Sequence, residues 1–160
     1  KVEKIMNQNN ELVTNMSEII WTMNSNFDTL ESTITYIRHY SAVFLEQYHI
    51  SLNFNSDINN PDFILSSEMR RNILLIVKEL LHNISKHSKA SVVNITIHQK
   101  NEKMIWKIND NGIGFDQPLN TFGNGLTNIK RRVLLLNGKL SIDTNSGTTI
   151  TFIIPMTNVI

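Results

Sequence analysis

The order of helical and strand patterns along the chain is the feature that most constrains its fold. The clearest helical pattern lies in residues 66–86, where a cap at Ser66 or Ser67 precedes apolar residues at three- and four-residue spacing. The residues of this apolar stripe are Ile73, Ile76, Val77, Leu80 and Ile84. Alternating apolar and polar residues then predict two strands, at 91–99 and 103–109.

The remaining patterns complete the expected fold. They predict helices at residues 1–24, at about 29–48 and at 124–136, and strands from Ile50 to Phe54, at 139–144 and at 148–155. About five strands and three helices therefore accompany the N-terminal helix. This order is typical of an α+β fold in which helices cover one face of a mixed sheet.

The sequence predicts further details of the first two helices. The first has a narrow apolar seam, which usually packs on another helix, at Leu12, Met16, Ile19 and Met23. Asp28 and Glu31 resemble a capping box for the second helix, with Phe27 placed as a hydrophobic staple.

Length, charge and composition exclude several classes of protein. The 160 residues suit one domain, and the net charge of +1 gives no strong field for nucleic acid or an anionic membrane. The absence of cysteine excludes disulfides and thiolate metal sites. No apolar run is long enough to span a membrane. Because Lys1 rather than methionine comes first, we interpret the chain as a fragment of a longer protein.

The loop from Asp110 to Gly114 combines an acid with two glycines directly after a predicted strand. Its carboxylate could accept a hydrogen bond from the amine of a flat polar ring. Gly112 and Gly114 have no Cβ, so that backbone and ligand can approach closely. An Asn-Gly hairpin turn without a ligand would explain the same residues.

A second candidate stretch lies at the end of the third predicted helix. Glu79, Asn83 and Lys86 are spaced four and three apart, so they share a stripe at the border of the buried face. The amide oxygen of Asn83 is a suitable ligand for Mg²⁺, and Lys86 and His87 could contact phosphate. An ordinary polar helix face would explain this spacing equally well.

Two further glycine-containing stretches complete the candidates. Gly123-Asn124-Gly125-Leu126 opens a predicted helix, whose exposed N–H groups could bind an anion. Gly147-Thr148-Thr149 enters the last predicted strand, where a hydroxyl could reach a ring or a bridging water. Simple helix capping and a hairpin turn are the structural alternatives.

Together and in this order, these stretches resemble the ATP-binding domain of sensor histidine kinases, in the gyrase, chaperone, histidine kinase and MutL (GHKL) ATPase superfamily. Residues 79–88 resemble the N box, 110–114 the G1 box, 123–129 the G2 box, and 147–149 the last element on the adenine side. The resemblance covers residues 65–156. It implies a two-layer α/β sandwich of the Bergerat type, which binds ATP and Mg²⁺.

On the adenine side, the resemblance assigns a role to each matching residue. Asp110 would accept a hydrogen bond from the adenine amine, and Gly112 and Gly114 would flank the ring. Thr148 or Thr149 would assist through a water molecule.

On the phosphate side, the resemblance places the catalytic residues Glu79 and Asn83, with Asn83 as a ligand of Mg²⁺. Lys86 and His87 would contact the phosphates. The segment that closes on them would consist of Gly123, Asn124, Gly125 and Leu126.

The ending Lys86-His87-Ser88 and the short segment between Gly114 and Gly123 resemble the nitrate- and desaturase-sensor branch of these kinases. Residues 16–21 resemble the end of its dimerisation hairpin. We therefore expect residues 1–26 to belong to the dimerisation helix and linker, and residues 27–160 to form the catalytic domain.

This resemblance implies a homodimeric parent kinase in the inner membrane, with the present chain on its cytoplasmic side. The parent would transfer the γ-phosphoryl group of ATP to a histidine, and then to an aspartate of a response-regulator receiver domain.

One departure concerns the phosphorylated histidine, which in this branch precedes an acidic residue. None of the five histidines here does so: His39, His49, His82, His87 and His98. We therefore expect the acceptor upstream of Lys1. The competing hypotheses are an ATP-gated binding module, a serine kinase of the anti-sigma type, and an interaction domain that has lost nucleotide binding.

Overall fold

The structure is a computed structural model that describes residues 1–114 and 124–157, and within these ranges it contains one five-stranded sheet. The strands are β1 (Ser51–Asp57), β2 (Val92–Lys100), β3 (Lys103–Asp110), β4 (Lys139–Asp143) and β5 (Thr148–Pro155). They lie in the order β1-β2-β3-β5-β4. Because β1 and β2 are parallel and the other neighbours antiparallel, the predicted mixed sheet is confirmed.

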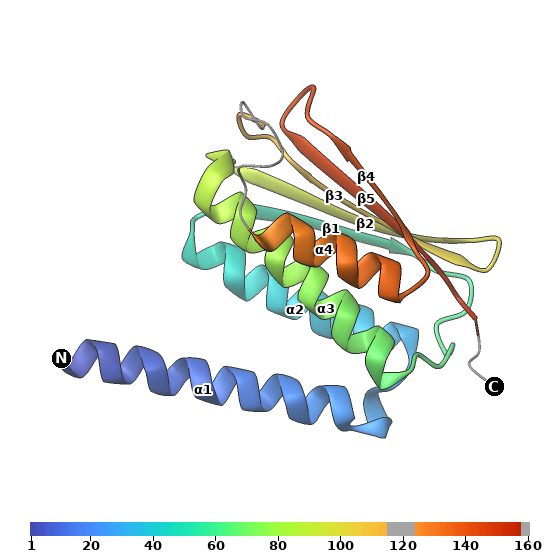
Figure 1. The fold of residues 1–160 in the computed structure, drawn as a ribbon, viewed down its shortest axis with the longest axis horizontal. Helices are drawn as coiled ribbons and strands as arrows, with labels where there is room; N and C mark the ends of the chain where they lie inside the picture. Colours follow the sequence, from blue (N-terminus) through green and yellow to red (C-terminus); the bar gives the residue numbers. More distant parts are fainter. Residues whose placement is uncertain (115–123, 158–160) are drawn as a thin grey trace.

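Helices cover one face of this sheet. They are α2 (Leu30–Gln47), α3 (Ser67–Asn83) and α4 (Asn124–Leu135). Figure 1 shows these three helices as one layer against the sheet, with α1 (Val2–Met23) on the side of that layer away from the strands. The predicted α+β architecture of two layers is therefore confirmed.

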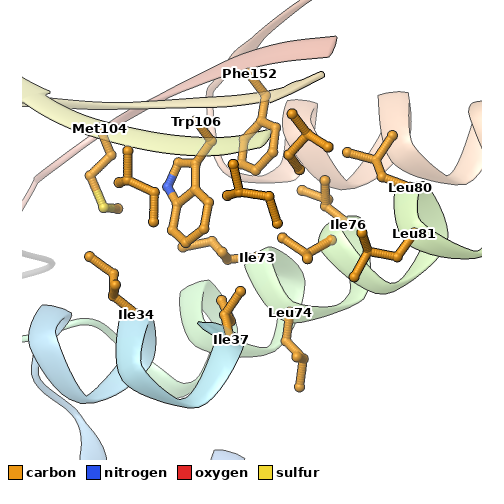
Figure 2. Packing of buried hydrophobic residues seen from close by; sticks show 14 of the residues in the cluster. Ile34, Ile37, Ile73, Leu74, Ile76, Leu80, Leu81, Met104, Trp106 and Phe152 are labelled. Atoms are coloured by element: carbon orange, nitrogen blue, oxygen red, sulfur yellow. The ribbon is translucent and has the colours of Figure 1, made fainter. Parts of the chain in front are cut away.

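The core lies between α3 and the middle strands. Trp106 of β3 and Phe152 of β5 are register partners whose ring centroids lie 5.7 Å apart, and both side chains are fully buried. Ile73 and Ile76 of α3 lie beneath these rings (Figure 2). All five residues of the predicted α3 stripe are buried. This packing holds α3 at a fixed position on the sheet, and with it the polar residues at its C-terminal end.

The structure corrects the predicted start of α2. Ser66 caps α3 as expected, but α2 is capped by Thr29, whose hydroxyl accepts a hydrogen bond from the Ser32 N–H at 3.1 Å. Asp28 instead uses its carbonyl to accept from the Leu65 N–H at 2.8 Å. Phe27 is 45% exposed and forms no staple. A distant segment, around Leu65, therefore decides where this helix begins.

The predicted N-terminal helix is confirmed as α1, but its predicted seam is exposed. The four seam residues are 57–76% exposed, whereas the residues that α1 buries are Glu18, Trp21 and Thr22. Among the residues that the structure describes, the seam therefore does not pack on another helix of this chain. Over the described ranges, none of the helices combines the length and apolar character that crossing a membrane requires.

Candidate functional site

A small pocket, partly open to solvent, lies where the end of α3 meets the end of β3 and the starts of α4 and β5. Its lining residues are Leu80, Asn83, Ile84, His87, Ser88, Ile108, Asp110, Gly114, Leu126, Thr148 and Ile150. The pocket brings together residues from all four candidate stretches of the sequence, which lie up to 70 positions apart in the chain.

The walls of this pocket are apolar. Ile108 and Ile150 are register partners on β3 and β5 and face the helix layer, and Leu80 lies opposite them on α3. Branched aliphatic side chains on both sides suit a flat ring, which gains contact area on both faces. No functional role was predicted for these residues, although the alternation that places Ile108 and Ile150 on one face of two strands was visible in the sequence.

Asp110 places a carboxylate inside this apolar pocket. It is 1% exposed, and its Oδ1 accepts a hydrogen bond from the Gly112 N–H at 2.8 Å. Burial raises the pKa of Asp110, while the backbone N–H groups of Gly112 and Thr148 oppose that rise. A buried acid whose pKa is perturbed in a pocket is a candidate for ligand recognition.

The structure changes the reason for the glycine at position 112. A Cβ there would lie 2.1 Å from the carbonyl oxygen of Ser88, and the Ile113 N–H donates to that same oxygen at 2.8 Å. The close approach is therefore between two segments of this protein, rather than only between backbone and ligand. It ties the loop after β3 to the turn after α3, so the two sides of the pocket share one backbone contact.

Gly114 and Gly147 form a second close contact. Gly114 has φ +71° and Gly147 has φ +73°, a left-handed conformation that favours glycine. A Cβ on Gly147 would lie 2.0 Å from the carbonyl oxygen of Asp110. The start of β5 therefore packs directly on the backbone of Asp110. The Asn-Gly sequence after Asp110 does not form the hairpin that was the alternative interpretation, because β3 pairs with the distant β5 on this side.

The end of α3 changes from α-helix to a π-helical turn at Ile84–Ser88, a form that often occurs at functional sites. This turn brings His87 and Ser88 to the pocket beside Asn83. Lys86 is exposed and lies outside the lining. The structure thus brings Asn83 and His87 to the pocket, and leaves Lys86 at the surface.

Glu79 lies against the start of α4. A Cβ on Gly125 would lie 2.2 Å from the Glu79 Oε1 and 3.5 Å from the Asn83 Oδ1. Two polar groups of α3 therefore face the N-terminal turn of α4, where a glycine leaves room for them. Leu126 is 5% exposed and lines the pocket, whereas Asn124 is exposed and outside the lining. Gly123 lies outside the described residues.

The two candidate threonines lie on opposite faces of β5. Thr148 is buried in the pocket lining and is the register partner of Asp110. Thr149 faces the other side of the sheet, where its Oγ1 accepts from the Asn109 Nδ2 at 2.8 Å. Strand alternation therefore places Thr148, and not Thr149, in the lining of this pocket.

Within the described ranges, no group of three or more His, Asp or Glu side chains is arranged to hold a metal ion. A cation near Asn83 would therefore take most of its ligands from water or from a bound phosphate. His82 lies outside the pocket lining, with its ring centroid 4.6 Å from that of Phe44. Burial lowers the pKa of His82, and the nearby Lys86 and Lys78 lower it further, against the opposite effect of Glu79.

Asn111 has a structural role that was not predicted from the sequence. Its Oδ1 accepts hydrogen bonds from the Ser91 and Val92 N–H groups, each at 2.9 Å, and its Nδ2 donates to the Ser91 Oγ at 2.9 Å. Asn111 therefore fixes the loop after β3 to the start of β2. Its position between Asp110 and Gly112 was visible, but its partners lie 19 and 20 residues away.

Two curated relatives are sensor kinases. The signal transduction histidine-protein kinase/phosphatase DegS of Brevibacillus brevis is 35% identical over 132 residues, which are 81% of this chain and 32% of DegS. The oxygen sensor histidine kinase NreB of Staphylococcus carnosus is 28% identical in an alignment 163 residues long, which covers 99% of this chain and 45% of NreB. The chain therefore spans less than half of the length of either relative.

Solved structures share the fold. The Acinetobacter baumannii histidine kinase AdeS superposes with a TM-score of 0.68 at 18% identity, over 98% of this chain and 84% of that one. The histidine kinase domain of the Erythrobacter litoralis blue-light activated kinase gives a TM-score of 0.65 at 19% identity, over 78% of this chain and 61% of that one. At these identities the likeness concerns the fold.

The family described as histidine kinase-, DNA gyrase B- and HSP90-like ATPase matches residues 69–158, which is more than half of the chain. The matched segment contains the whole lining of the pocket. The chain thus belongs to the histidine kinase-, DNA gyrase B- and HSP90-like ATPase family.

Proposed function

We propose that this chain is the ATP-binding catalytic domain of a sensor histidine kinase. The observation that carries the proposal is the buried carboxylate of Asp110, which lies in an apolar pocket together with Asn83 and His87 of the N box. The family match and the names of the curated relatives support the same function.

For the adenine, Asp110 supplies the acceptor of the amine hydrogen bond, and Ile108, Ile150 and Leu80 supply apolar contacts with the ring. Thr148 lies beside Asp110 in the lining and can hold a bridging water with its hydroxyl. A buried hydrogen-bond acceptor discriminates strongly against ligands without the matching donor, because it would then remain unpaired.

For the phosphates, the residues that face the start of α4 fit a nucleotide with Mg²⁺. The Asn83 amide oxygen is a hard ligand, and the Glu79 carboxylate lies near it at Gly125. Bound Mg²⁺ would neutralise phosphate charge. Lys86 and His87 then lie on the turn where they can contact phosphate oxygens, and Gly123 and Asn124 belong to the segment expected to close on them.

The reaction would break the bond between the γ-phosphorus and its bridging oxygen, and form a bond from that phosphorus to an imidazole nitrogen. ADP leaves with the bridging oxygen. The protein contributes mainly position and charge neutralisation to such a transfer. We place the acceptor histidine upstream of residue 1, in a homodimeric parent whose partner is the receiver domain of a response regulator. As ATP is cytoplasmic, we assign this domain to the cytoplasmic side of an inner-membrane parent.

Acid lability of the phosphorylated product tests the proposed function. The parent protein is incubated with radiolabelled ATP, and the labelled protein is divided between acid and alkali. Phosphohistidine is lost in acid and survives alkali, so we expect the label to disappear in acid only. Label that survives acid would indicate a serine kinase. ATP turnover without any labelled protein would indicate an ATP-gated module, and no nucleotide binding would indicate an interaction domain.

Because Thr148 and Thr149 lie on opposite faces of β5, we expect different results from the same substitution at these two positions. Thr148→Val is expected to weaken ATP binding by about 2–10-fold, because one hydrogen bond contributes about 0.5–1.5 kcal/mol. Thr149→Val is expected to leave ATP affinity within about twofold, because its hydroxyl faces Asn109 on the other side of the sheet. Isothermal titration calorimetry measures both. Equal losses from the two variants would contradict this placement.

A further inference from the structure

A row of polar side chains crosses the face of the sheet opposite the helix layer (Figure 1). Asn53 of β1 donates from its Nδ2 to the Asn94 Oδ1 of β2 at 2.9 Å. The Asn94 Nδ2 donates to the Asn109 Oδ1 of β3 at 3.2 Å, and the Asn109 Nδ2 donates to the Thr149 Oγ1 of β5 at 2.8 Å. This polar row therefore joins register partners on four neighbouring strands through their side chains.

Asparagine is a poor choice for the interior of a strand. Strands favour β-branched and aromatic residues, and the asparagine side chain competes for backbone hydrogen bonds. The polar row nevertheless contains an asparagine on each of β1, β2 and β3. All of its amides donate in the same direction along the row, so the bonds can strengthen one another. A local choice that opposes strand formation is typical of a functional position.

The polar row lies at the pocket end of the sheet. Asn109 precedes Asp110, the last residue of β3, and Thr149 follows Thr148, the first residue of β5. Asp110 and Thr148 are register partners, and both line the pocket on the other face. Because strand ends open more readily than strand centres, a link at this row acts where opening would displace the carboxylate.

Asn109 has the central position in the polar row. It is half-buried and joins β3 to both of its neighbours, through Asn94 on β2 and Thr149 on β5. Its Nδ2 also lies 3.5 Å from the carbonyl oxygen of Asp110. Gly147 approaches the same oxygen so closely that a Cβ there would lie 2.0 Å from it. The backbone of Asp110 is thus held by neighbouring groups while its carboxylate lines the pocket.

We propose that Asn109 is a positioning residue, which holds the end of β3 against β2 and β5 so that the Asp110 carboxylate keeps its place in the pocket. Asn94 and Thr149 are the partners through which it acts, and either one is sufficient because each ties β3 to a neighbouring strand. The consequence for nucleotide binding rests on the proposed function. A carboxylate that is already in place loses less freedom when adenine binds, which raises affinity.

Two substitutions of similar shape test this role. Asn109→Val removes both bonds, whereas Asn109→Thr keeps a hydroxyl that can bond to Thr149. Valine and threonine both favour strands, so neither should lower the free energy of unfolding measured by chemical denaturation. We expect Asn109→Val to weaken ATP binding by about 3–10-fold in calorimetry, and Asn109→Thr by less than about twofold.

Hydrogen exchange measures the end of β3 without any nucleotide. The Asn111 N–H donates to the Val92 carbonyl oxygen at 3.2 Å, directly beyond Asp110. In Asn109→Val, exchange of the Asn111 amide should become at least about fivefold faster, because the strand end opens more often. Exchange of the Trp106 amide, in the middle of β3, should stay within about twofold. Asn109→Thr should exchange like the unsubstituted chain at both amides.

Substitution of the partners provides a second test. Asn94→Val and Thr149→Val should each leave ATP affinity within about twofold, because Asn109 keeps one partner in either variant. The double variant removes both partners, and should weaken binding about as much as Asn109→Val. The two substitutions should therefore be non-additive, as expected for residues that share one partner.

The role of Asn109 is refuted if Asn109→Val binds ATP as tightly as the unsubstituted chain, or if Asn109→Thr loses as much affinity as Asn109→Val. Equal exchange of the Asn111 amide in all variants would refute it as well. A large loss of stability in Asn109→Val would contradict it, because the polar row would then serve folding. If the unsubstituted chain binds no ATP, the proposed function fails, whereas faster exchange in Asn109→Val would still support the role of Asn109 at the strand end.

Discussion

Gly147→Ala is expected to lower the free energy of unfolding by about 2–4 kcal/mol, which combines a left-handed backbone with a steric clash. The clash is severe because the added Cβ would lie 2.0 Å from the Asp110 carbonyl oxygen and 3.0 Å from its carbonyl carbon. These are backbone atoms at the end of a paired strand. The clash can therefore be relieved only if β3 and β5 move apart beside the pocket. Chemical denaturation monitored by circular dichroism measures the change.

Two controls identify the cause of this loss. Ser146→Ala changes an exposed neighbour and should shift the unfolding free energy by less than about 0.5 kcal/mol. Gly147→Asn introduces a Cβ on a residue that tolerates the left-handed region. If the clash dominates, asparagine will destabilise about as much as alanine. A stable Gly147→Ala protein with native ATP affinity would contradict the close contact between Gly147 and Asp110.

Asp110→Asn is expected to weaken ATP binding by about 1–3 kcal/mol, or about 5–150-fold. Asparagine keeps one oxygen, which can still accept from the Gly112 N–H. Its amide NH₂ replaces the other oxygen, so a donor would face the donor amine of adenine. Isothermal titration calorimetry at neutral pH measures the loss. Asp57→Asn is the matched control, an acid-to-amide change at the exposed end of β1 that should leave affinity unchanged.

The pH dependence gives Asp110 a second readout. Burial raises the pKa of Asp110, so the folded state binds this proton more tightly than the unfolded chain. This carboxyl therefore contributes stability below its ordinary pKa of 3.8, and the contribution is lost as the pH rises through the raised value. ATP affinity has the opposite trend, since the acceptor must be ionised, and should fall as the pH falls. In the Asp110→Asn variant, ATP affinity should lack the part of the pH dependence that comes from ionisation of this carboxyl. An unchanged affinity in this variant would contradict the adenine assignment.

The sequence predicted the elements of the fold well because each depends on local periodicity. The apolar stripe of α3 and the alternation of apolar and polar residues in β3 and β5 predict which side of each element is buried. The structure confirms both predictions. The mixed sheet also followed from the order of the elements. The capping residue of α2, which is Thr29 rather than Asp28, was predicted wrongly because the Asp28 carbonyl accepts from the Leu65 N–H, a contact between distant segments that capping patterns do not contain.

The candidate site was predicted in part. Asp110, Asn83 and His87, which were selected because they belong to motifs with restrictive spacing, line one pocket in the structure. The choice between Thr148 and Thr149 stayed open, since one residue of strand register decides which threonine faces inward. The partner of Gly112 was also unpredictable, because Ser88 meets it only through folding.

The sequence by itself determined the types of the elements, the family and the polar residues of the pocket such as Asn83 and Asp110, since helical and strand periods and short motifs are local properties. Tertiary structure alone decided which close contacts the glycines permit, which face of α1 is buried, and which side chains Asn109 bonds. Those features depend on distances between segments far apart in the chain. Asn109, for example, bonds side chains 15 and 40 residues away, which become its neighbours only through strand pairing.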